Sequence, residues 1–435
     1  MEPEKLLEEA KRRAERAEIF FLKETKVTAS FEANRLKQIR RREIKGVSLR
    51  VINEGRMGFA AARGEAGGEI VEKALQASLM GPPANFSFPA ERAFPNVAVF
   101  DPSLEALPEE ELVKLGLEAI EQIREKEPAI VCEGSTSWSL LEIGILNSEG
   151  GEAFYRKTLL SGAMEGILVR DEDMLFVGDS QSSCSRFQDL SEMARSICEQ
   201  LERAKKIVPA PSGPASVLFT PLGVASALVL PLALALNGKN VFHGSSPLAG
   251  RLGEEVFSPL LSAWDEPLAD FRPGSRPCDD EGTPSRKIAL IERGAVRNFV
   301  YDLQTAALAG AETTGSASRS LTEPPSPEIS VLRIAPGDKS FREMLAEMRE
   351  GFVVEELMGA SQANVMGGEI SGNILLGYRV EGGEIAGRVK NAMLHGNIYT
   401  ALRRIIAISR EARWVGGDLH LPYILCEGLN ISLRG

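Results

Sequence analysis

The sequence predicts an α+β fold of two domains, with helices packed on antiparallel or mixed sheets. Helical and strand-like patterns are interspersed along the chain, but they never form the repeated strand–helix–strand units of a parallel α/β fold. The chain has 435 residues, which is enough for two or three domains with cores of their own. A segment rich in proline, residues 207–214, interrupts the periodic pattern. We therefore expect an N-terminal α+β domain over residues 1–206, a linker over 207–214 and a C-terminal α+β domain over 215–435.

The N-terminal half begins with a predicted helix over residues 4–17, because its apolar residues fall on one helical stripe. Between residues 18 and 63 the pattern changes to short alternating runs, which are typical of antiparallel strands. Asn53-Glu54-Gly55 separates two of these runs and is typical of a hairpin turn, since glycine accepts positive φ. The remaining elements expected in this half are helices over 68–80, 109–126 and 190–206, and strands within 130–176.

The C-terminal half opens with an uncharged stretch, Ala215–Leu236, that is long enough to span a membrane. Pro221 and Pro231 interrupt it, and no basic flank supports insertion. We therefore expect a short buried strand over 215–220 followed by a buried helix, and no contact with a membrane. A loop-rich stretch follows, and the further strands expected lie at 286–292, 295–301, 329–334, 377–380 and 384–390.

The formal net charge of −11 argues against binding to nucleic acid, because an acidic surface repels a phosphate backbone. The basic run Lys37–Lys45 alternates with apolar residues, so we interpret it as a solvated strand face rather than a DNA-binding arm. The five cysteines are odd in number and widely spaced, which is typical of buried thiols in a reducing compartment. The N-terminal segment is charged and lacks the pattern of a secretory signal peptide, so we expect a cytoplasmic protein.

Motifs of self-contained catalysis are missing from the sequence. There is no Gly-x-Ser-x-Gly elbow, no phosphate-binding Walker loop and no Gly-x-Gly-x-x-Gly after a strand. The three histidines, His243, His395 and His420, are far apart, and none is followed by glutamate. A metal-binding helix with a local His-Glu pair therefore cannot form. A zinc site assembled from these histidines in space is left open, but we favour structural roles for them.

Two acidic segments and one segment of small residues are further candidates for a catalytic or binding site. Asp279-Asp280-Glu281 could supply ligands for a hard cation or an acid–base pair, but consecutive residues on an extended segment point in alternate directions. We therefore favour a solvated loop there, and likewise at Asp171-Glu172-Asp173. The small-residue segment Thr313–Arg319 could bind an anion or an extended peptide through its amides and hydroxyls. A flexible, solvated loop is an equal alternative for this segment.

Several blocks of sequence, taken together and in order, resemble the TldD/PmbA family, whose members are also known as modulators of DNA gyrase. The block in the N-terminal half is SFEANRLKQIRRREIKGVSLRVINEGRMGFAAA, with Gly46, Arg50, Gly55 and Gly58 at its turns. The blocks in the C-terminal half are NGKNVFHGSSPLAGRLGEEVFSPLLSAWDEP, CDDEGTPSRKIALIERGAVRNFVYDLQTAALAGAETTGSASR, GGEISGNILLGYRVEGGEIAGRVKNAMLHGNIYTAL and LPYILCEGLNISL. With their flanks they cover most of the chain.

Within that family the chain resembles the TldE/PmbA branch rather than the TldD branch. The TldD branch looks like a zinc-type peptidase with His-Glu-x-x-x-His on a helix and a further cysteine ligand near the C-terminus. Read backward from Gly244-Ser245-Ser246, those three helix positions fall on Val229, Leu230 and Leu234. None of these side chains can bind a metal or act as a base. Cys426 does not match the cysteine motif either.

The resemblance implies a subunit that binds no cofactor or metal itself and pairs with a TldD-like partner carrying the zinc-type metal. Such complexes clip unfolded or short peptides, including microcin precursors and an antitoxin. An extended substrate would add a strand to a sheet, where main-chain hydrogen bonds read any sequence. The family blocks also contain residues that we expect to be structural or to line a peptide groove, not to be catalytic: Asp280, Glu281, Gly282, Thr314, Gly315 and Arg319.

Two other readings remain open from the sequence. The first is a stand-alone peptide-binding or scaffolding homodimer without proteolytic activity. The second is a modulator of DNA gyrase, which the acidic charge disfavours if it acts through DNA but not if it contacts the gyrase protein.

Overall fold

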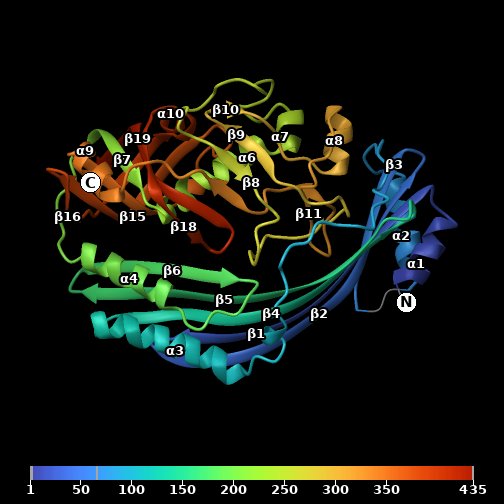
Figure 1. Cartoon of the computed structure of the whole chain (residues 1–435), viewed down its shortest axis with the longest axis horizontal. Coiled ribbons are helices and arrows are strands. Elements are labelled where there is room, and N and C mark those ends of the chain that lie inside the picture. Colours follow the sequence, from blue (N-terminus) through green and yellow to red (C-terminus); the bar gives the residue numbers. More distant parts are fainter. Residues whose placement is uncertain (1–2, 65–66, 434–435) are drawn as a thin grey trace.

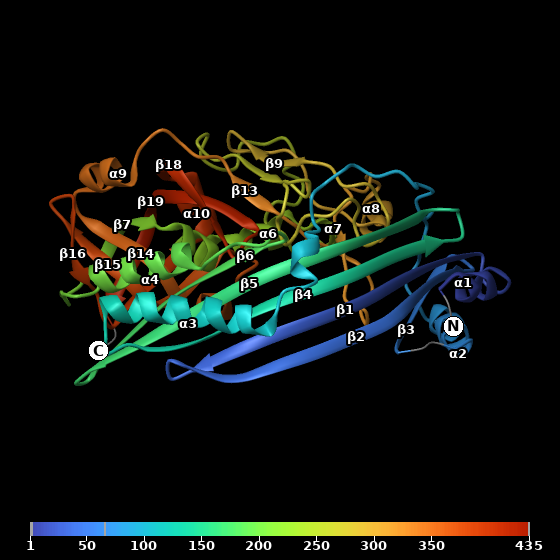
Figure 2. The same cartoon turned by 60° about the horizontal axis from the view of Figure 1, so that its bottom comes forward.

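The computed structural model describes residues 3–64 and 67–433. Its N-terminal half is built on one long antiparallel sheet (Figure 2). Its six strands follow the order β3-β2-β1-β4-β5-β6. Figure 2 shows the four central strands running along most of the molecule beneath the C-terminal half. The strands are β1 (Arg16–Glu32), β2 (Arg35–Asn53), β3 (Arg56–Arg63), β4 (Val131–Asn147), β5 (Glu152–Arg170) and β6 (Asp173–Ser183).

The meander expected over residues 18–63 is present, but the prediction of short runs is wrong. Residues 18–32, which read as two separate runs, belong to a single strand of 17 residues, β1, which pairs with β2 along its whole length. At about 3.3 Å per residue, such a strand is more than 50 Å long. The hairpin at Asn53 is confirmed, with Glu54 and Gly55 at positive φ between β2 and β3.

Helices cover the two ends of this sheet (Figure 1). At one end lie α1 (Pro3–Lys11) and α2 (Glu69–Ser78), and toward the other end lie α3 (Glu109–Lys126) and α4 (Ser191–Arg203). The bounds predicted for α3 are confirmed; its first turn carries Glu109–Glu111 and its last turn carries Arg124 and Lys126, which suits the helix dipole. The first helix is shorter than predicted, because the chain enters β1 at Arg16 and buries Ala17 in the sheet.

The C-terminal half contains an eleven-stranded mixed sheet, part of which closes on itself. Five strands pair in the cyclic order β7-β14-β15-β17-β19, since β19 pairs with both β17 and β7. We call these five strands the ring. They are β7 (Gly213–Phe219), β14 (Gly351–Met358), β15 (Glu369–Glu381), β17 (Ala392–Asn397) and β19 (Leu419–Leu433).

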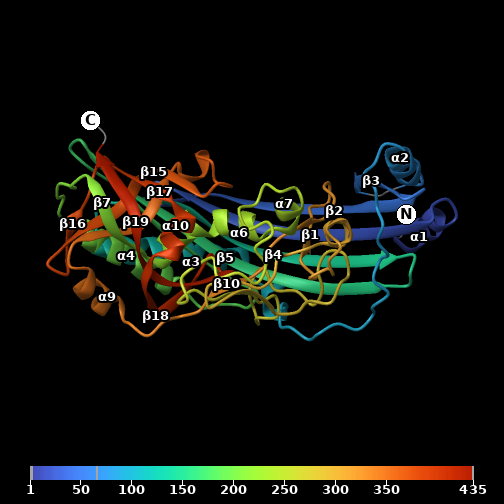
Figure 3. The same cartoon turned by 90° about the horizontal axis from the view of Figure 1, so that it is seen from above.

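The other strands extend or flank the ring, and short helices connect them (Figure 3). These strands are β8 (Ala263–Asp265), β9 (Ile288–Glu292), β10 (Ala295–Val296), β11 (Ala317–Ser318), β12 (Ser326–Pro327), β13 (Leu332–Ile334), β16 (Glu384–Arg388) and β18 (Ile405–Val415). The helices are α5 (Pro221–Val224), α6 (Leu230–Leu236), α7 (Gly238–Phe242), α8 (Leu303–Ala309), α9 (Phe341–Met348) and α10 (Ile398–Arg403). The predicted α+β class, with helices on antiparallel and mixed sheets, is confirmed.

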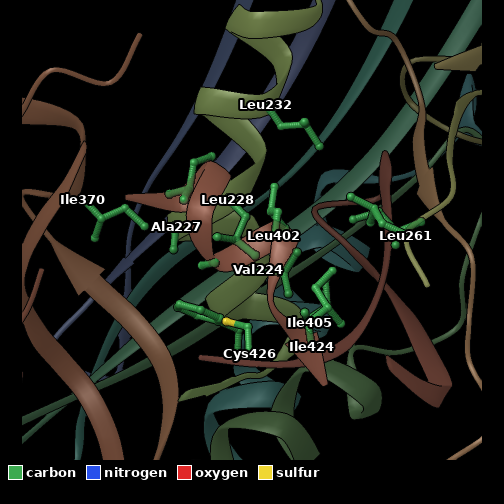
Figure 4. Close-up of a cluster of buried hydrophobic side chains, with 14 of the residues drawn as sticks. Val224, Ala227, Leu228, Leu232, Leu261, Ile370, Leu402, Ile405, Ile424 and Cys426 are labelled. Atoms are coloured by element: carbon green, nitrogen blue, oxygen red, sulfur yellow. The ribbon is translucent and has the colours of Figure 1, made fainter. Parts of the chain in front are cut away.

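The buried strand and helix predicted from the uncharged stretch are confirmed as β7 and the helical segment 221–236. That segment runs through α5, a π-helical turn (Ala225–Val229) and α6. Figure 4 shows its side chains Val224, Ala227 and Leu228 facing the core of the C-terminal half, near Ile424 and Cys426 of β19. No helix among the described residues has both the length and the apolar character needed to cross a membrane.

The two halves share a hydrophobic core, so they form one packed body. Leu218 of β7, Val353 of β14 and Tyr378 of β15 join the cluster that contains Ile197 and other residues of α4. The segment expected to be a linker, 207–214, follows the edge of the C-terminal sheet, where the N–H of Val208 donates to the carbonyl of Arg388 at 2.9 Å. The strand expected over 295–301 is reduced to the two residues of β10.

Candidate functional site

The Asp279–Glu281 segment lies at the junction of the two halves, and it is not the solvated loop that spacing favoured. Asp279 and Glu281 are both fully buried. The carboxylate of Asp279 accepts the N–H groups of Glu281 at 3.0 Å, Thr283 at 2.9 Å and Ala317 at 3.0 Å. Gly282 has a φ of 79°, which lets the chain turn back at this point. Asp279 therefore organises the turn rather than facing solvent.

A chain of buried ion pairs joins this turn to the N-terminal sheet. Glu281 accepts from Arg50 of β2 at 2.5 Å, and Arg50 also donates to Glu18 of β1 at 2.8 Å. The other oxygen of Glu18 lies 2.8 Å from Arg319. All four side chains are at most 1% exposed. We call them, together with Asp279, the junction cluster.

Aromatic rings enclose the arginines of the junction cluster. The guanidinium carbon of Arg50 lies 5.3 Å from the ring centre of Phe86 and 5.0 Å from that of Phe88. That of Arg319 lies 4.4 Å from the ring centre of Phe20. Cation–π contacts of this kind stabilise a charge that has lost its water. The cluster is therefore sealed by both carboxylates and aromatic faces.

Burial acts on every carboxyl group of the junction cluster, and the number of neighbouring cations decides how far it is opposed at Glu18 and Glu281. Burial raises the pKa of Glu281 to about 8; Arg50 opposes the shift, whereas Asp302 and Asp279 add to it. Burial also disfavours charge on Glu18, but Arg319 and Arg50 together outweigh it and lower the pKa of Glu18. Glu18 thus has two cations, whereas Glu281 has one.

The Thr313–Arg319 segment folds against the same turn, so the flexible, solvated alternative is wrong. Thr314 and Ser316 are buried, and the hydroxyl of Thr314 accepts the N–H of Tyr301 at 2.7 Å. Gly315 has a φ of 70° and lies against the carbonyl of Pro284, where a Cβ would approach to 3.0 Å. The N–H of Arg319 donates to Asp280 at 3.0 Å.

The structure thus brings together all the family-block residues that were expected to be structural or to line a groove. Their polar groups are largely occupied by one another at the junction, and the side chains of Glu281 and Arg319 are closed to solvent. This geometry favours the structural role of the two. The segment Asp171–Asp173 lies elsewhere, at the turn from β5 to β6, where Asp173 pairs with Arg388 and with Lys390, the latter at 2.8 Å.

The three positions that the resemblance aligns with the metal motif of TldD-like chains lie on the helical segment 221–236. Val229 and Leu234 are half-buried, and Leu230 is 46% exposed. Across residues 3–64 and 67–433 there is no group of three or more histidine, cysteine or acidic side chains placed to hold a metal ion. Burial raises the pKa of the Cys426 thiol to about 12, so it is not a thiolate near neutral pH. The residues present here do not fit a metal.

The histidines are dispersed over the C-terminal half. His243 ends α7 beside the ring of Phe242, and His395 lies on β17 opposite Asn430. His420 lies on β19, with its ring centre 4.8 Å from that of Trp414. Burial lowers the pKa of His420, which favours the neutral form.

Two adjoining cavities between the two halves are the main feature that local sequence patterns did not reveal. One cavity of about 560 Å³ lies between β6, α4 and β18, and a second of about 660 Å³ adjoins it along β4 to β6 and the helical segment 221–236. We call the two together the interdomain trench. The residues that line both are Asp179, Ser180, Gln200 and Glu355.

Ion pairs cross the interdomain trench and join the two halves there. Glu355 of β14 accepts from Arg203 of α4 at 2.8 Å and from the hydroxyl of Thr220 at 3.0 Å. Burial raises the pKa of Glu355, and Arg203 opposes that shift. Arg413 of β18 donates to Asp179 of β6 at 2.6 Å. The two partners of each contact are more than 130 residues apart in the sequence. These contacts could therefore not be predicted from a local motif.

Asp418 follows Gly417, which lines the trench, and its raised pKa should make the stability of the protein depend on pH. Burial raises its pKa to about 6, although it accepts the N–H of Gly274 at 2.5 Å. The native state then binds the proton more tightly than the unfolded state, so this group costs stability as the pH rises from about 4 to about 6. Asp418→Asn keeps the acceptor without the charge. Its free energy of unfolding relative to the wild type should rise by about 1–3 kcal/mol between pH 4 and pH 7.

Denaturant unfolding of both proteins at the two pH values measures this difference. A difference that stays constant across that interval would contradict the assignment of the pH dependence to Asp418.

Comparisons with known proteins cover nearly the whole chain. Models of the PmbA/TldA metallopeptidase domain 1, central domain and C-terminal domain match residues 17–78, 102–205 and 212–433. An uncharacterised protein of Methanocaldococcus jannaschii is 25% identical over 433 residues, covering 98% of this chain and 99% of that protein. A protein of Methanothermobacter thermautotrophicus named metalloprotease is 27% identical over 273 residues, covering 62% of this chain and 60% of its own length.

The fold also matches a solved structure. The crystal structure of TldE from Thermococcus kodakarensis superposes with a TM-score of 0.88 at 24% identity, and the match covers 99% of both chains. At that identity, the likeness shows the fold alone.

Proposed function

Since this chain belongs to the PmbA/TldD metallopeptidase family, we propose that it is the metal-free subunit of a two-subunit cytoplasmic peptidase. A TldD-like chain would supply the zinc-type metal, and the complex would cleave unfolded or short peptides, as in peptide maturation or antitoxin turnover. One observation carries the proposal: no histidine in the sequence is followed by glutamate, and the positions that the resemblance aligns with His-Glu-x-x-x-His of TldD-like chains are Val229, Leu230 and Leu234.

The chemistry of amide hydrolysis supports this division of labour. A metallopeptidase needs a Lewis acid to polarise the carbonyl and a base to activate water. Valine and leucine have no lone pair for either task, and the helical segment that carries them packs by its methyl groups on the core of the C-terminal half. Such a helix can shape a wall or an interface, but it cannot perform the reaction.

The first test is a peptidase assay on this chain, its TldD-like partner and their co-expressed complex. We expect this chain alone to leave an unfolded peptide intact, and we expect the complex to cleave it at least roughly 100-fold faster, since a bound metal supplies several kcal/mol of transition-state stabilisation. A chelator should abolish the cleavage. A complex whose partner has its motif glutamate replaced by glutamine is the matched control. Chelator-sensitive cleavage by this chain alone would overturn the proposal.

A pull-down from the native cell separates this function from a stand-alone peptide-binding or scaffolding homodimer. Under the proposed function the chain copurifies with a TldD-like subunit. Recovery of this chain only with copies of itself, from a cell that also makes a TldD-like protein, favours the homodimer instead.

A further inference from the structure

The 560 Å³ cavity of the interdomain trench is lined mainly by polar groups from both halves of the molecule. Residues of α4 and β6 form one side, and β18 forms the other together with Arg272 from the loop between β8 and β9. Figure 1 shows β18 above β6 and α4. The volume is within the range of about 300–1,000 Å³ that is typical of small-molecule sites. The cavity is thus large enough for a small molecule that contacts both halves.

Three of the four arginines that line this cavity are held in ion pairs with its four carboxylates. The pairs are Arg203 with Glu199 and Glu355, Arg413 with Asp179, and Arg195 with Glu192. Arg272 is the fourth arginine, and no described carboxylate lies within ion-pair distance of it. Since one arginine takes two carboxylates, the lining keeps one guanidinium whose N–H donors have no acceptor in the described chain.

Stacking holds the guanidinium of Arg272 in place. Its carbon lies 4.1 Å from the ring centre of Trp414. Burial lowers the pKa of Arg272, and the charge of Asp418 offsets this only in part. Asp418 acts on Lys157 as well, so its charge is shared between two cations. A stacked guanidinium with free donors is suited to bind a phosphate or a carboxylate in a bidentate manner.

The same cavity presents neutral polar groups without partners. Neither atom of the Gln181 amide is hydrogen-bonded within the described part of the chain, and its Oε1 atom is buried. Buried acceptors of this kind are costly, so they are usually satisfied by protein, water or a ligand. The lining hydroxyl groups that have no partner among the described residues belong to Ser180, Ser182, Ser196 and Tyr423. Such groups favour an occupant that carries several hydroxyl groups over an apolar one.

We propose that this cavity binds a small polyhydroxylated anion, a phosphorylated sugar or a sugar acid. Its phosphate or carboxylate lies on Arg272, and its hydroxyl groups bind Gln181 and the serines of β6. Because such a ligand contacts the N-terminal half through β6 and the C-terminal half through Arg272, it stabilises the packing of the two halves. The site takes no part in peptide cleavage, so the inference does not rest on the proposed function.

Isothermal titration calorimetry of the purified chain tests this site with four probes, which are ribose 5-phosphate, gluconate, ribose and inorganic phosphate. We expect at least one of the two sugar anions to bind with a Kd of about 1 mM or lower. That anion should bind roughly tenfold or more tightly than ribose and than inorganic phosphate, since only the sugar anions carry both kinds of group. Comparing ribose 5-phosphate with gluconate shows whether the site prefers a phosphate or a carboxylate.

Arg272→Gln tests the anion contact. It should weaken binding of the preferred sugar anion roughly tenfold or more, because it removes the charge and the bidentate donors. Arg195→Gln is the matched control, since Arg195 lines the same cavity but its side chain is 68% exposed and pairs with Glu192. It should change the affinity by less than about threefold.

Gln181→Leu tests the contact to the hydroxyl groups. Leucine is similar in size but has no amide, so the preferred sugar anion should bind roughly threefold or more weakly. Because the Oε1 atom of Gln181 has no partner in the described chain, the substitution should not lower the midpoint of thermal unfolding without ligand. A loss of affinity in this variant is therefore not a loss of the fold.

Circular dichroism verifies that each variant is folded. The inference would be overturned if no probe bound the wild type up to about 10 mM, or if ribose bound as tightly as both sugar anions. Wild-type affinity in Arg272→Gln would overturn it as well. These measurements need no partner subunit and no hydrolysis, so their failure is distinct from a failure of the peptidase assay.

Discussion

Replacing Arg50 with methionine should lower the free energy of unfolding by about 3–5 kcal/mol, because it removes the central cation of a buried ion-pair chain. Glu18 keeps Arg319, but Glu281 loses its cation and stays fully buried. Methionine has a length close to that of arginine and can lie between the rings of Phe86 and Phe88, so the loss reports the missing cation rather than an empty space. Urea denaturation followed by circular dichroism at neutral pH gives the value.

Two further variants make this measurement specific to the junction cluster. Adding Glu281→Gln to Arg50→Met should recover part of the loss, since glutamine is neutral already, whereas Glu281, with a pKa of about 8, must take up a proton to be buried at neutral pH. Arg41→Met removes an exposed arginine that pairs with Glu43 at 3.2 Å, and it should change stability by less than about 1 kcal/mol. If Arg50→Met lowered the free energy of unfolding by less than about 1 kcal/mol, the junction cluster would not stabilise the packing of the two halves.

The long strands of the N-terminal sheet show why their length could not be predicted from the sequence. β1 is buried on both faces at residues 17–20, partly exposed over 21–26 and alternating from Val27 to Phe31. β2 is exposed on both faces from 35 to 43 and buried on both faces from 47 to 52. A strand keeps one periodic pattern only while its surroundings stay constant. Each of these strands changes neighbours along its length, so its sequence resembles several short runs. α3, which meets the same core along its whole length, was predicted to the residue.

The junction cluster illustrates a different limit of local reasoning. The expectation that consecutive side chains of Asp279–Glu281 point in different directions is sound geometry, but it does not imply solvent exposure. Asp279 accepts hydrogen bonds from backbone N–H groups of its own turn. Glu281 pairs with Arg50, which is 231 residues away in the sequence. Spacing within a segment cannot reveal a partner at that separation. The resemblance to a known family marked these residues, and the tertiary contacts explain why they belong together.

The ring in the C-terminal half was the least predictable part of the fold. No strand was expected beyond residue 390, so β17, β18 and β19 were not predicted from the sequence. β18 pairs with β19 through a hairpin, but the pairing that closes the ring spans a long separation. β19 pairs with β7, which precedes it by about 200 residues, so the closing contact leaves no local signature. In contrast, β7 and the helical segment after it were recognised because an uncharged run with prolines is compatible only with burial.

Gly223→Ala should lower the free energy of unfolding by about 2–4 kcal/mol, although alanine normally favours a helix by about 1 kcal/mol over glycine. A Cβ at this position would lie 2.1 Å from the carbonyl oxygen of Val354. That carbonyl is held in place, because it accepts the N–H of Thr220 at 3.1 Å and belongs to β14 of the ring. The clash can therefore be relieved only by moving the start of the helical segment that carries Val229 and Leu230 away from the sheet.

The sign of the change is what makes this prediction informative. Gly67→Ala adds the same methyl group where no heavy atom lies within 4 Å, so it should alter stability by less than about 0.5 kcal/mol. If Gly223→Ala were neutral or stabilising by urea denaturation, the helical segment would not be pressed against β14. Its apolar positions could then move independently of the ring. Gly223 lies in α5, where alanine is the better helix former, whereas Gly67 lies outside any helix, so helix propensity alone would favour Gly223→Ala over Gly67→Ala. A loss in Gly223→Ala with none in Gly67→Ala therefore means that the close backbone approach to β14 outweighs that preference.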